Sequence, residues 1–310
     1  MTTVSRLACL SLVSLLFGCE GASETAVSRT PSYPDAMVEL RGTLDAAALP
    51  MAVAKGAVGR TSVFDSKLLG TPYMPRGFEY PRDPDGRPLT LLAQINFADV
   101  PPLPRYPSSG ILQFYISDDI DDRGHVWGLQ FYERTPHDPV AQFVLQQSQD
   151  YFRVVWHKDV VTDTAQLSDS VPRTSGGVMP IDDEAKLSFS ADLGYPIPID
   201  YRFERIVGQN EYDFFDRFGD EADDVMIQYY DFAVPQSIAW IGGYAFFTQS
   251  DPRENVRDDD WLLLLEIQST VSEDQPSVMW GDAGIGAFFI RAEDLEKRNF
   301  SRVLYTWDNH

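Results

Sequence analysis

The sequence predicts a single compact α+β domain in which a β-rich unit is used twice and packs with a few helices. The main observation is an internal repeat, with copies at about residues 61–116 and 240–290. Each copy closes on the pattern Gly-Ile-x-x-Phe-aromatic-Ile, which begins at Gly110 and at Gly284. Such a repeat indicates one supersecondary unit that occurs twice around a shared core. No linker divides residues 33–310, which we assign to one domain.

Apolar runs rich in β-branched and aromatic residues predict the strands. Residues 89–95 are apolar at most positions, as expected for a strand that is buried on both faces. Further strands are expected at 111–116, 126–132 and 151–157. Between residues 158 and 200, polar loops alternate with short apolar pieces, and no regular element is assigned there.

Apolar residues at three- and four-residue spacing predict the helices. Residues 34–58 have this spacing in their first half, and Pro50 is expected to end or kink the helix. Residues 211–231 are expected to form two helices, because Gly219 and the acidic residues after it interrupt the pattern. A last short helix is expected at 292–298.

The N-terminus has the features of a bacterial export signal. Arg6 precedes an apolar run at residues 7–18, which is too short to span a membrane but typical of a signal-peptide core. Gly18-Cys19 resembles the end of a lipobox, in which the cysteine thiol takes a diacylglycerol. We therefore expect a lipoprotein signal peptide at 1–18, lipidation at Cys19, and a flexible tether across 19–32. An ordinary signal peptide with an incidental Cys19 is the alternative.

This N-terminus predicts a protein of the bacterial cell envelope, periplasmic or surface-facing, that meets the membrane only through its N-terminal lipid. Cleavage before Cys19 removes Cys9, and lipidation consumes Cys19, so the mature domain is expected to have no free thiol. Disulfides, thiolate nucleophiles and cysteine metal sites are then excluded.

The chain is strongly acidic, with 47 Asp and Glu residues against 25 Lys and Arg residues and a formal net charge of −22. Nucleic-acid binding depends on the neutralisation of phosphates by clustered cations, so no nucleic-acid partner is expected. Docking of the folded surface on anionic lipid headgroups is disfavoured for the same reason. The acidity is explained by solubility alone. The more specific explanation is that it attracts a basic partner or divalent cations.

A series of tight motifs runs through the chain in order. They are Ser66-Lys67-x-x-Gly70-x-Pro72-Tyr73, Leu91-Leu92-Ala93-Gln94-Ile95-Asn96, Gly242-Gly243-Tyr244-x-x-Phe247-Thr248-Gln249-x-Asp251-Pro252-Arg253 and Met279-Trp280-Gly281-Asp282-Ala283-Gly284. Together they resemble the YwqG-like family over about residues 61–308. The resemblance implies an α+β fold with internal duplication and no assigned activity. Some members lie near toxin genes, which suggests an immunity role.

The chain departs from the family pattern in two ways. The family's usual Gln-Ile-Asp in the second copy is Glu266-Ile267-Gln268 here, so no role of that aspartate is carried over. Members are usually intracellular, whereas the lipobox-like N-terminus predicts export.

The strongest candidate ligand-binding residues are Asp251, Arg253, Trp280 and Asp282, which lie in two of these motifs. If the three charged side chains converge, they form a polar pocket for a charged substrate. The alternative, which we favour, is that Asp251 or Asp282 pairs with Arg253 to hold a turn.

No catalytic residue, metal site or cofactor is assigned. The acidic run from Asp118 to Gly124 has some positions of a calcium loop, but Arg123 and Gln130 stand where ligands are required. A solvated hairpin is therefore expected there. The four histidines are scattered without the paired spacing of zinc ligands, at His125, His137, His157 and His310.

These observations predict a lipid-anchored envelope protein of the YwqG-like fold with a non-enzymatic binding or protective, immunity-like role. A protein partner is expected, either a toxin or an envelope component. The alternative is a carboxylate-dependent hydrolase of an envelope polymer, which requires Asp251 and Asp282 to line one open cleft. A calcium-dependent module is a third possibility.

Overall fold

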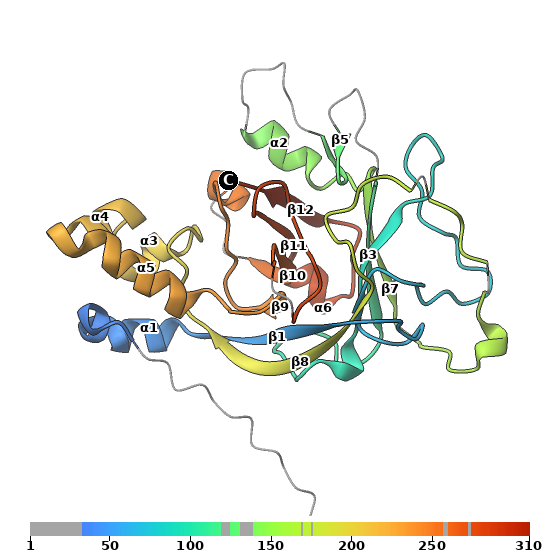
Figure 1. Ribbon diagram of the computed structural model, residues 1–310, viewed down its shortest axis with the longest axis horizontal. Helices are drawn as coiled ribbons and strands as arrows, with labels where there is room; N and C mark the ends of the chain where they lie inside the picture. The colour runs from blue at the N-terminus through green and yellow to red at the C-terminus, as the bar shows by residue number, and fades with distance from the viewer. Residues whose placement is uncertain are drawn as a thin grey trace, which may run out of the picture.

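Ten strands of the computed structural model form one antiparallel sheet that curls almost into a closed barrel (Figure 1). The structure describes residues 33–118, 125–130, 139–168, 170–174, 176–256, 260–271 and 274–310. The expected signal peptide, Cys19, the tether and most of the acidic run after Asp118 lie outside the described residues. Within the described ranges, no helix is both long enough and apolar enough to cross a membrane.

The strand order is β12-β11-β10-β9-β1-β8-β2-β3-β4-β7. The strands are β1 (Leu49–Val58), β2 (Lys67–Leu68), β3 (Thr90–Asn96), β4 (Ile111–Ile116), β7 (Phe152–His157), β8 (Ala185–Gly194), β9 (Ala239–Gly242), β10 (Trp261–Gln268), β11 (Ile285–Arg291) and β12 (Val303–Asp308). A separate hairpin joins β5 (His125–Val126) to β6 (Leu129–Gln130). The strands predicted at 89–95, 111–116 and 151–157 are confirmed, and the segment that begins at 126 forms part of this hairpin.

The region of edge strand β7 is linked to that of edge strand β12 by ring contacts and by hydrogen bonds. The rings of Phe152 and Tyr305 lie 5.1 Å apart. Gln149 donates a hydrogen bond from Nε2 to the carbonyl oxygen of Phe300 (2.8 Å). The backbone N–H of Tyr305 donates to the carbonyl oxygen of Gln146 (2.9 Å). These contacts occupy an edge that would otherwise be open to pairing with another chain.

The two longest strands, β1 and β8, pair over their full length at the centre of the sheet, and the sequence analysis predicted neither. Helix α1 (Arg41–Ala47) ends before Pro50, as expected, but the chain then continues directly as β1. Strand β8 was missed because small polar residues such as Ser188 and Ser190 occupy its exposed positions. Pairing with β1 and β2 stabilises β8 where local propensity is weak.

The sheet has two corresponding halves on either side of β1 and β8. Strands β2, β3, β4 and β7 follow one another on one side as β9, β10, β11 and β12 do on the other. A bulge interrupts β3 between Leu91 and Ala93, and a bulge interrupts β10 between Leu263 and Leu265. Five antiparallel steps separate β3 from β10, through β2, β8, β1 and β9. These two strands therefore run in opposite directions, and matching loops lie at opposite ends of the sheet.

Helices gather at one end of the sheet around a small apolar core of their own (Figure 1). This helical unit consists of η1 (Asp35–Leu40), α1, α3 (Phe203–Val207), α4 (Glu211–Asp216), η4 (Gly219–Glu221) and α5 (Ala222–Ala233). Met37, Leu44, Phe214 and Tyr229 are fully buried in its core. Gly219 has a φ of 57° and separates α4 from α5, as the sequence predicted.

The remaining helices are short and lie against the sheet or its loops. They are η2 (Phe97–Asp99), α2 (Pro139–Leu145), η3 (Thr164–Gln166), η5 (Pro252–Asn255) and α6 (Ala292–Glu296). The helix predicted at 292–298 is α6. The arrangement agrees with the predicted mixture of a dominant sheet and a few helices in one domain.

Candidate functional site

The loops after β2 and β9 contain glycines at matching positions of the repeat, Gly70 and Gly243. Similar hydrogen bonds hold the two loops. After β2, Lys67 donates from Nζ to the carbonyl oxygen of Thr71 (2.5 Å). After β9, Trp240 donates from Nε1 to the carbonyl oxygen of Tyr244 (3.0 Å). In each half, a buried side chain therefore fixes the loop carbonyl four residues further on.

A side chain from the neighbouring strand fixes each loop a second time. Gln94 on β3 accepts a hydrogen bond at Oε1 from the backbone N–H of Tyr73 (2.8 Å). Glu266 on β10 accepts from the backbone N–H of Phe246 at both carboxyl oxygens (3.1 and 3.2 Å). Gln94 and Glu266 are structural counterparts, and neither is exposed to solvent.

In the first half, this position belongs to a neutral polar network. Gln113 donates from Nε2 to Oε1 of Gln94 and to the carbonyl oxygen of Tyr73 (both 2.8 Å). The amide nitrogen of Gln113 is thereby used, so its Oε1 is an acceptor, and His157 donates to it from Nε2 (2.8 Å). Burial lowers the pKa of His157 to about 4, which keeps the imidazole neutral. The members of this network hydrogen-bond to one another, and we assign the network a structural role.

In the second half, charged residues lie around the corresponding position. Asp200-Tyr201-Arg202 and Asp251-Pro252-Arg253 form the same Asp-x-Arg fork. In each, Oδ1 of the aspartate accepts from the arginine backbone N–H (3.0 and 2.9 Å) and from its Nε (both 2.8 Å). Each Nη2 reaches Oδ2 of the same aspartate, at 2.7 and 2.6 Å. We call Asp200, Arg202, Asp251 and Arg253 the Asp–Arg cluster.

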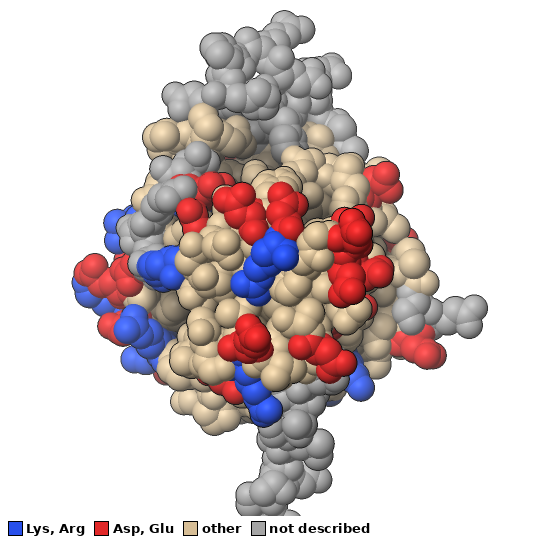
Figure 2. Space-filling model, turned by 90° about the vertical axis from the view of Figure 1, so that its left-hand side faces the viewer, with Lys and Arg blue, Asp and Glu red and all other residues tan. Residues whose placement is uncertain are grey.

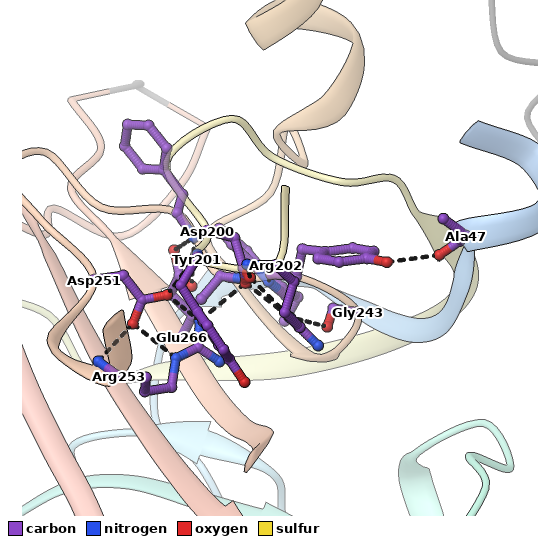
Figure 3. Close-up of polar contacts among 12 residues, drawn as sticks. Ala47, Asp200, Tyr201, Arg202, Gly243, Asp251, Arg253 and Glu266 are labelled. Carbon is purple, nitrogen blue, oxygen red and sulfur yellow. Dashed lines mark hydrogen bonds and ion pairs between the residues drawn. The ribbon is translucent and has the colours of Figure 1, made fainter. Parts of the chain in front are cut away.

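The two forks are locked together (Figure 3). Arg253 also donates from Nη2 to Oδ2 of Asp200 (2.9 Å). Oδ2 of Asp251 accepts from the backbone N–H of Tyr201 (3.1 Å), and Oδ2 of Asp200 accepts from that of Ala245 (3.3 Å). The segment before α3, the loop after β9 and helix η5 are therefore held as one unit.

The Asp–Arg cluster is sealed from solvent. Arg253 has no exposed surface, and Arg202, the most accessible of the four, is 9% exposed. Burial alone would raise the pKa of Asp200, but Arg202 and Arg253 hold it well below its usual range. Burial opposes the charge of Arg253, yet Asp251 and Asp200 raise its pKa above the usual value. Ion pairing therefore outweighs desolvation at both groups.

Aromatic rings line the cluster and connect it to the helical unit. The guanidinium carbon of Arg253 lies 4.2 Å from the ring centre of Phe289, and that of Arg202 lies 4.3 Å from the ring centre of Tyr244. The hydroxyl of Tyr244 donates to the carbonyl oxygen of Ala47, at the end of α1 (2.7 Å). The cluster therefore lies at the junction between the sheet and the helical unit.

The structure brings two of the four candidate site residues together. Asp251 and Arg253 form one of the forks, which is the structural pair favoured by the sequence. Trp280 is buried in the main core, where its ring contacts those of Trp127 and Trp307. Asp282 is exposed, and its carbonyl oxygen accepts from the backbone N–H of His310 (3.2 Å).

The described contacts do not bring Asp251 and Asp282 together as a hydrolytic site would require. No hydrogen bond or ion pair among the described residues joins Asp282 to Asp251 or Arg253. Asp251 is 3% exposed and ion-paired, which leaves it poorly placed to exchange protons with a substrate. In the described part of the chain, no group of three His, Cys, Asp or Glu side chains is placed to hold a metal ion.

Sequence reasoning missed Asp200, Arg202 and Glu266 as members of this site. A local signal for the first two was present, because the Asp-x-Arg triplet occurs at 200–202 as well as at 251–253. Glu266 is visible in the sequence as the repeat counterpart of Gln94 and as a departure from a family pattern, but its burial at the junction required the structure.

Comparison with known proteins gives a family but no activity. A family model described as a domain of unknown function (DUF1963) matches residues 66–309. That range contains nine of the ten strands of the main sheet and the whole Asp–Arg cluster. No curated protein matches the chain.

Proposed function

The chain belongs to this domain family of unknown function, and we propose that it is a non-catalytic binding protein that docks a basic protein partner on its helical unit. A lipid on Cys19 would hold it at the bacterial envelope. The observation that carries the proposal is the acidic surface of α3, α4, η4 and α5, which we call the acidic face.

Exposed acidic residues outnumber exposed basic residues on the acidic face. Between residues 203 and 233, all of which are described, the exposed acidic residues are Glu204, Asp213, Asp216, Asp220, Glu221, Asp223, Asp224 and Asp231. The exposed basic residues of this stretch are Arg205 and Arg217. Figure 2 looks onto this end of the molecule, where acidic side chains lie across the middle and the right-hand side and basic side chains lie at the centre and the left. Such a field attracts a basic partner and speeds its association.

Two exposed apolar side chains on the same helices add a non-electrostatic contribution. Tyr212 on α4 is 80% exposed, and Ile227 on α5 is 57% exposed. Tyrosine is enriched at the energetically important positions of protein interfaces. An aromatic contact surrounded by charges that set orientation is typical of a protein-docking surface rather than of a small-molecule site.

The Asp–Arg cluster supports a non-catalytic role for this domain. Its carboxylates and guanidinium groups are turned toward one another and are buried, so their interaction free energy stabilises the junction beneath the helical unit. A rigid junction keeps the acidic face in a fixed orientation, which lowers the entropy cost of binding. Among the described residues, no contact favours the alternative of a carboxylate-dependent hydrolase.

The nature of the partner follows from the proposed address and from the resemblance to YwqG-like proteins. An exported, lipid-anchored chain meets extracytoplasmic proteins, and an immunity-like protein meets a toxin. Both proposals lead to a basic extracytoplasmic protein, either a toxin that the chain neutralises or an envelope component that it holds.

Reversing charges on the acidic face is expected to weaken partner binding about tenfold or more, which corresponds to about 1.4 kcal/mol. The variant Asp216→Lys/Asp220→Lys/Asp231→Lys changes three exposed residues. The measurement is capture from a solubilised envelope fraction on immobilised protein, quantified by mass spectrometry at two salt concentrations. Captured protein should fall with the variant and with added salt.

The matched control, Glu79→Lys/Asp150→Lys/Asp159→Lys, makes the same change of charge at three exposed positions outside the helical unit. It is expected to capture the same basic protein as the unmodified chain. Equal losses with both triple variants would mean that net charge rather than the acidic face governs binding.

The proposed anchor predicts a lipidated mature N-terminus. Mass spectrometry of the protein from fractionated cells should find diacylated Cys19 in the membrane fraction, and Cys19→Ala should move the protein out of that fraction. An intact Met1 in the soluble fraction would contradict the envelope address. The partner of the acidic face would then be sought inside the cell.

A further inference from the structure

We propose that Glu266 holds a proton in the folded protein, and that loss of this proton loosens the loop of residues 243–248 at the junction with the helical unit. The inference goes beyond the proposed function, because it concerns how the junction responds to pH and not what the acidic face binds. It starts from the position of Glu266 in the duplicated fold.

The counterpart of Glu266 in the first half is a neutral amide. Gln94 accepts from the backbone N–H of its loop, and the carboxyl group of Glu266 accepts from the matching N–H. A protonated carboxyl group is neutral and combines an O–H donor with remaining acceptor capacity, as the neutral amide of glutamine combines donor and acceptor groups. A protonated Glu266 is therefore the closer analogue of Gln94.

Three carboxyl groups from three different elements hold the loop. The N–H of Ala245 donates to Asp200 (3.3 Å), that of Phe246 to Glu266, and that of Thr248 to Asp308 on β12 (3.0 Å). Asp200 has two arginine partners. Asp308 is only partly buried and receives two further hydrogen bonds, from Oγ1 of Thr248 and the N–H of Gln249.

Glu266 differs from Asp200 in having no cation of its own, and it differs from Asp308 in the extent of its burial. It is fully buried, and no ion pair joins it to any described residue. The charged groups that face it are Arg253 on η5, Asp200 before α3 and Asp308 on β12, with His310 near Asp308. Nε and Nη2 of Arg253 already donate to Asp251 and Asp200, and its Nη1 has no hydrogen-bond partner among the described residues. The Asp–Arg cluster is neutral when both forks are paired, so ionised Glu266 would add an unbalanced buried charge.

Electrostatics agree with the geometry. Burial raises the pKa of Glu266 well above its usual value, and the nearby Asp308 and Asp200 add to the effect. The hydrogen bond from Phe246 and the charge of Arg253 act in the opposite direction and do not offset burial.

The direction of the pH dependence follows from this raised pKa. Below the usual value of 4.5, Glu266 is protonated in the folded and the unfolded chain, and it adds no pH dependence. Above 4.5, the unfolded chain releases the proton while the folded chain keeps it. The contribution of Glu266 to the free energy of unfolding therefore falls as pH rises, until the folded pKa is reached.

The test compares the full chain with Glu266→Gln by amide hydrogen exchange, expressed as protection factors from about pH 5 to about pH 8. In the unmodified protein, protection of Ala245 and Phe246 should fall about tenfold or more across this range relative to Glu266→Gln. Asp282→Asn, which removes an exposed carboxylate, should follow the unmodified protein. Equal pH profiles for the unmodified protein and Glu266→Gln would overturn the proposal.

A second measurement needs no variant. Carboxyl carbon NMR of glutamate-labelled protein, with Glu266 assigned from its backbone resonances, should show a carboxyl group that does not titrate near 4.5. Titration of this signal at the usual value would also overturn the proposal, whether or not Glu266→Gln folds.

Discussion

Replacement of Arg253 by methionine is expected to lower the free energy of unfolding by about 3–5 kcal/mol, the usual effect of breaking a buried ion pair from one side. Arg253 has no exposed surface and bridges Asp251 to Asp200. Its removal leaves Asp251 without a cation and Asp200 with Arg202 alone. Urea denaturation followed by far-UV circular dichroism measures the change.

Two further variants serve as comparisons: one keeps the positive charge at position 253 without the guanidinium fork, and the other removes an exposed arginine. Arg253→Lys keeps the charge but cannot form the planar fork, so a smaller loss than with methionine is expected. Arg41→Met removes an arginine whose side chain is 61% exposed, and a change within about 0.5 kcal/mol is expected. If Arg253→Met were as stable as the unmodified chain, the Asp–Arg cluster would not stabilise the junction.

Replacement of Gly284 by alanine is expected to cost about 3 kcal/mol or more through steric overlap. An added Cβ at Gly284 would lie 1.6 Å from the carbonyl oxygen of Asp308, a backbone atom that cannot move without disturbing β12. The matching Gly110 is also closed to a side chain, because a Cβ there would lie 2.3 Å from the ring of Trp156. The two glycines that open the repeated motif are therefore required by packing.

A glycine-to-alanine change at a position with free space should raise the free energy of unfolding instead of lowering it. Gly42 lies in α1, and an added Cβ there meets no atom within 4 Å. Gly42→Ala should stabilise the protein by about 0.5 kcal/mol, because alanine has the higher helix propensity. Thermal denaturation of both variants under one condition makes the comparison. Destabilisation by both would mean that glycine matters for a reason other than packing.

The sequence predicted the repeated strands because their patterns are local. Strands β3, β4 and β11 are nearly continuous apolar runs, and buried strands need no other signal. Strands β1 and β8 were not predicted, since each is exposed at many positions and is stabilised by its partner across more than a hundred residues. Long-range pairing of this kind has no signature in a single window of sequence.

The site was predicted in part for the same reason. Asp251 and Arg253 lie two residues apart, so their pairing could be foreseen from the turn that they share. Asp200 reaches Arg253 from the segment before α3, and Glu266 on β10 reaches the loop after β9. Their contribution depends on how β9, β10 and the helical unit meet. Trp280 and Asp282 share a motif with glycines that are needed for close packing, which drew attention to them as candidate site residues.

The central claim, that a basic protein docks on the acidic face, is tested most directly by photocrosslinking in intact cells. A photoreactive amino acid replaces Tyr212 in the acidic face, and in a second strain it replaces Val271, which is 82% exposed on the connection between β10 and β11. The account predicts a discrete adduct with one basic protein from position 212, which is absent from position 271 and weakened by the Asp216→Lys/Asp220→Lys/Asp231→Lys changes. An adduct from position 271 alone, or adducts that are unaffected by these changes, would contradict it.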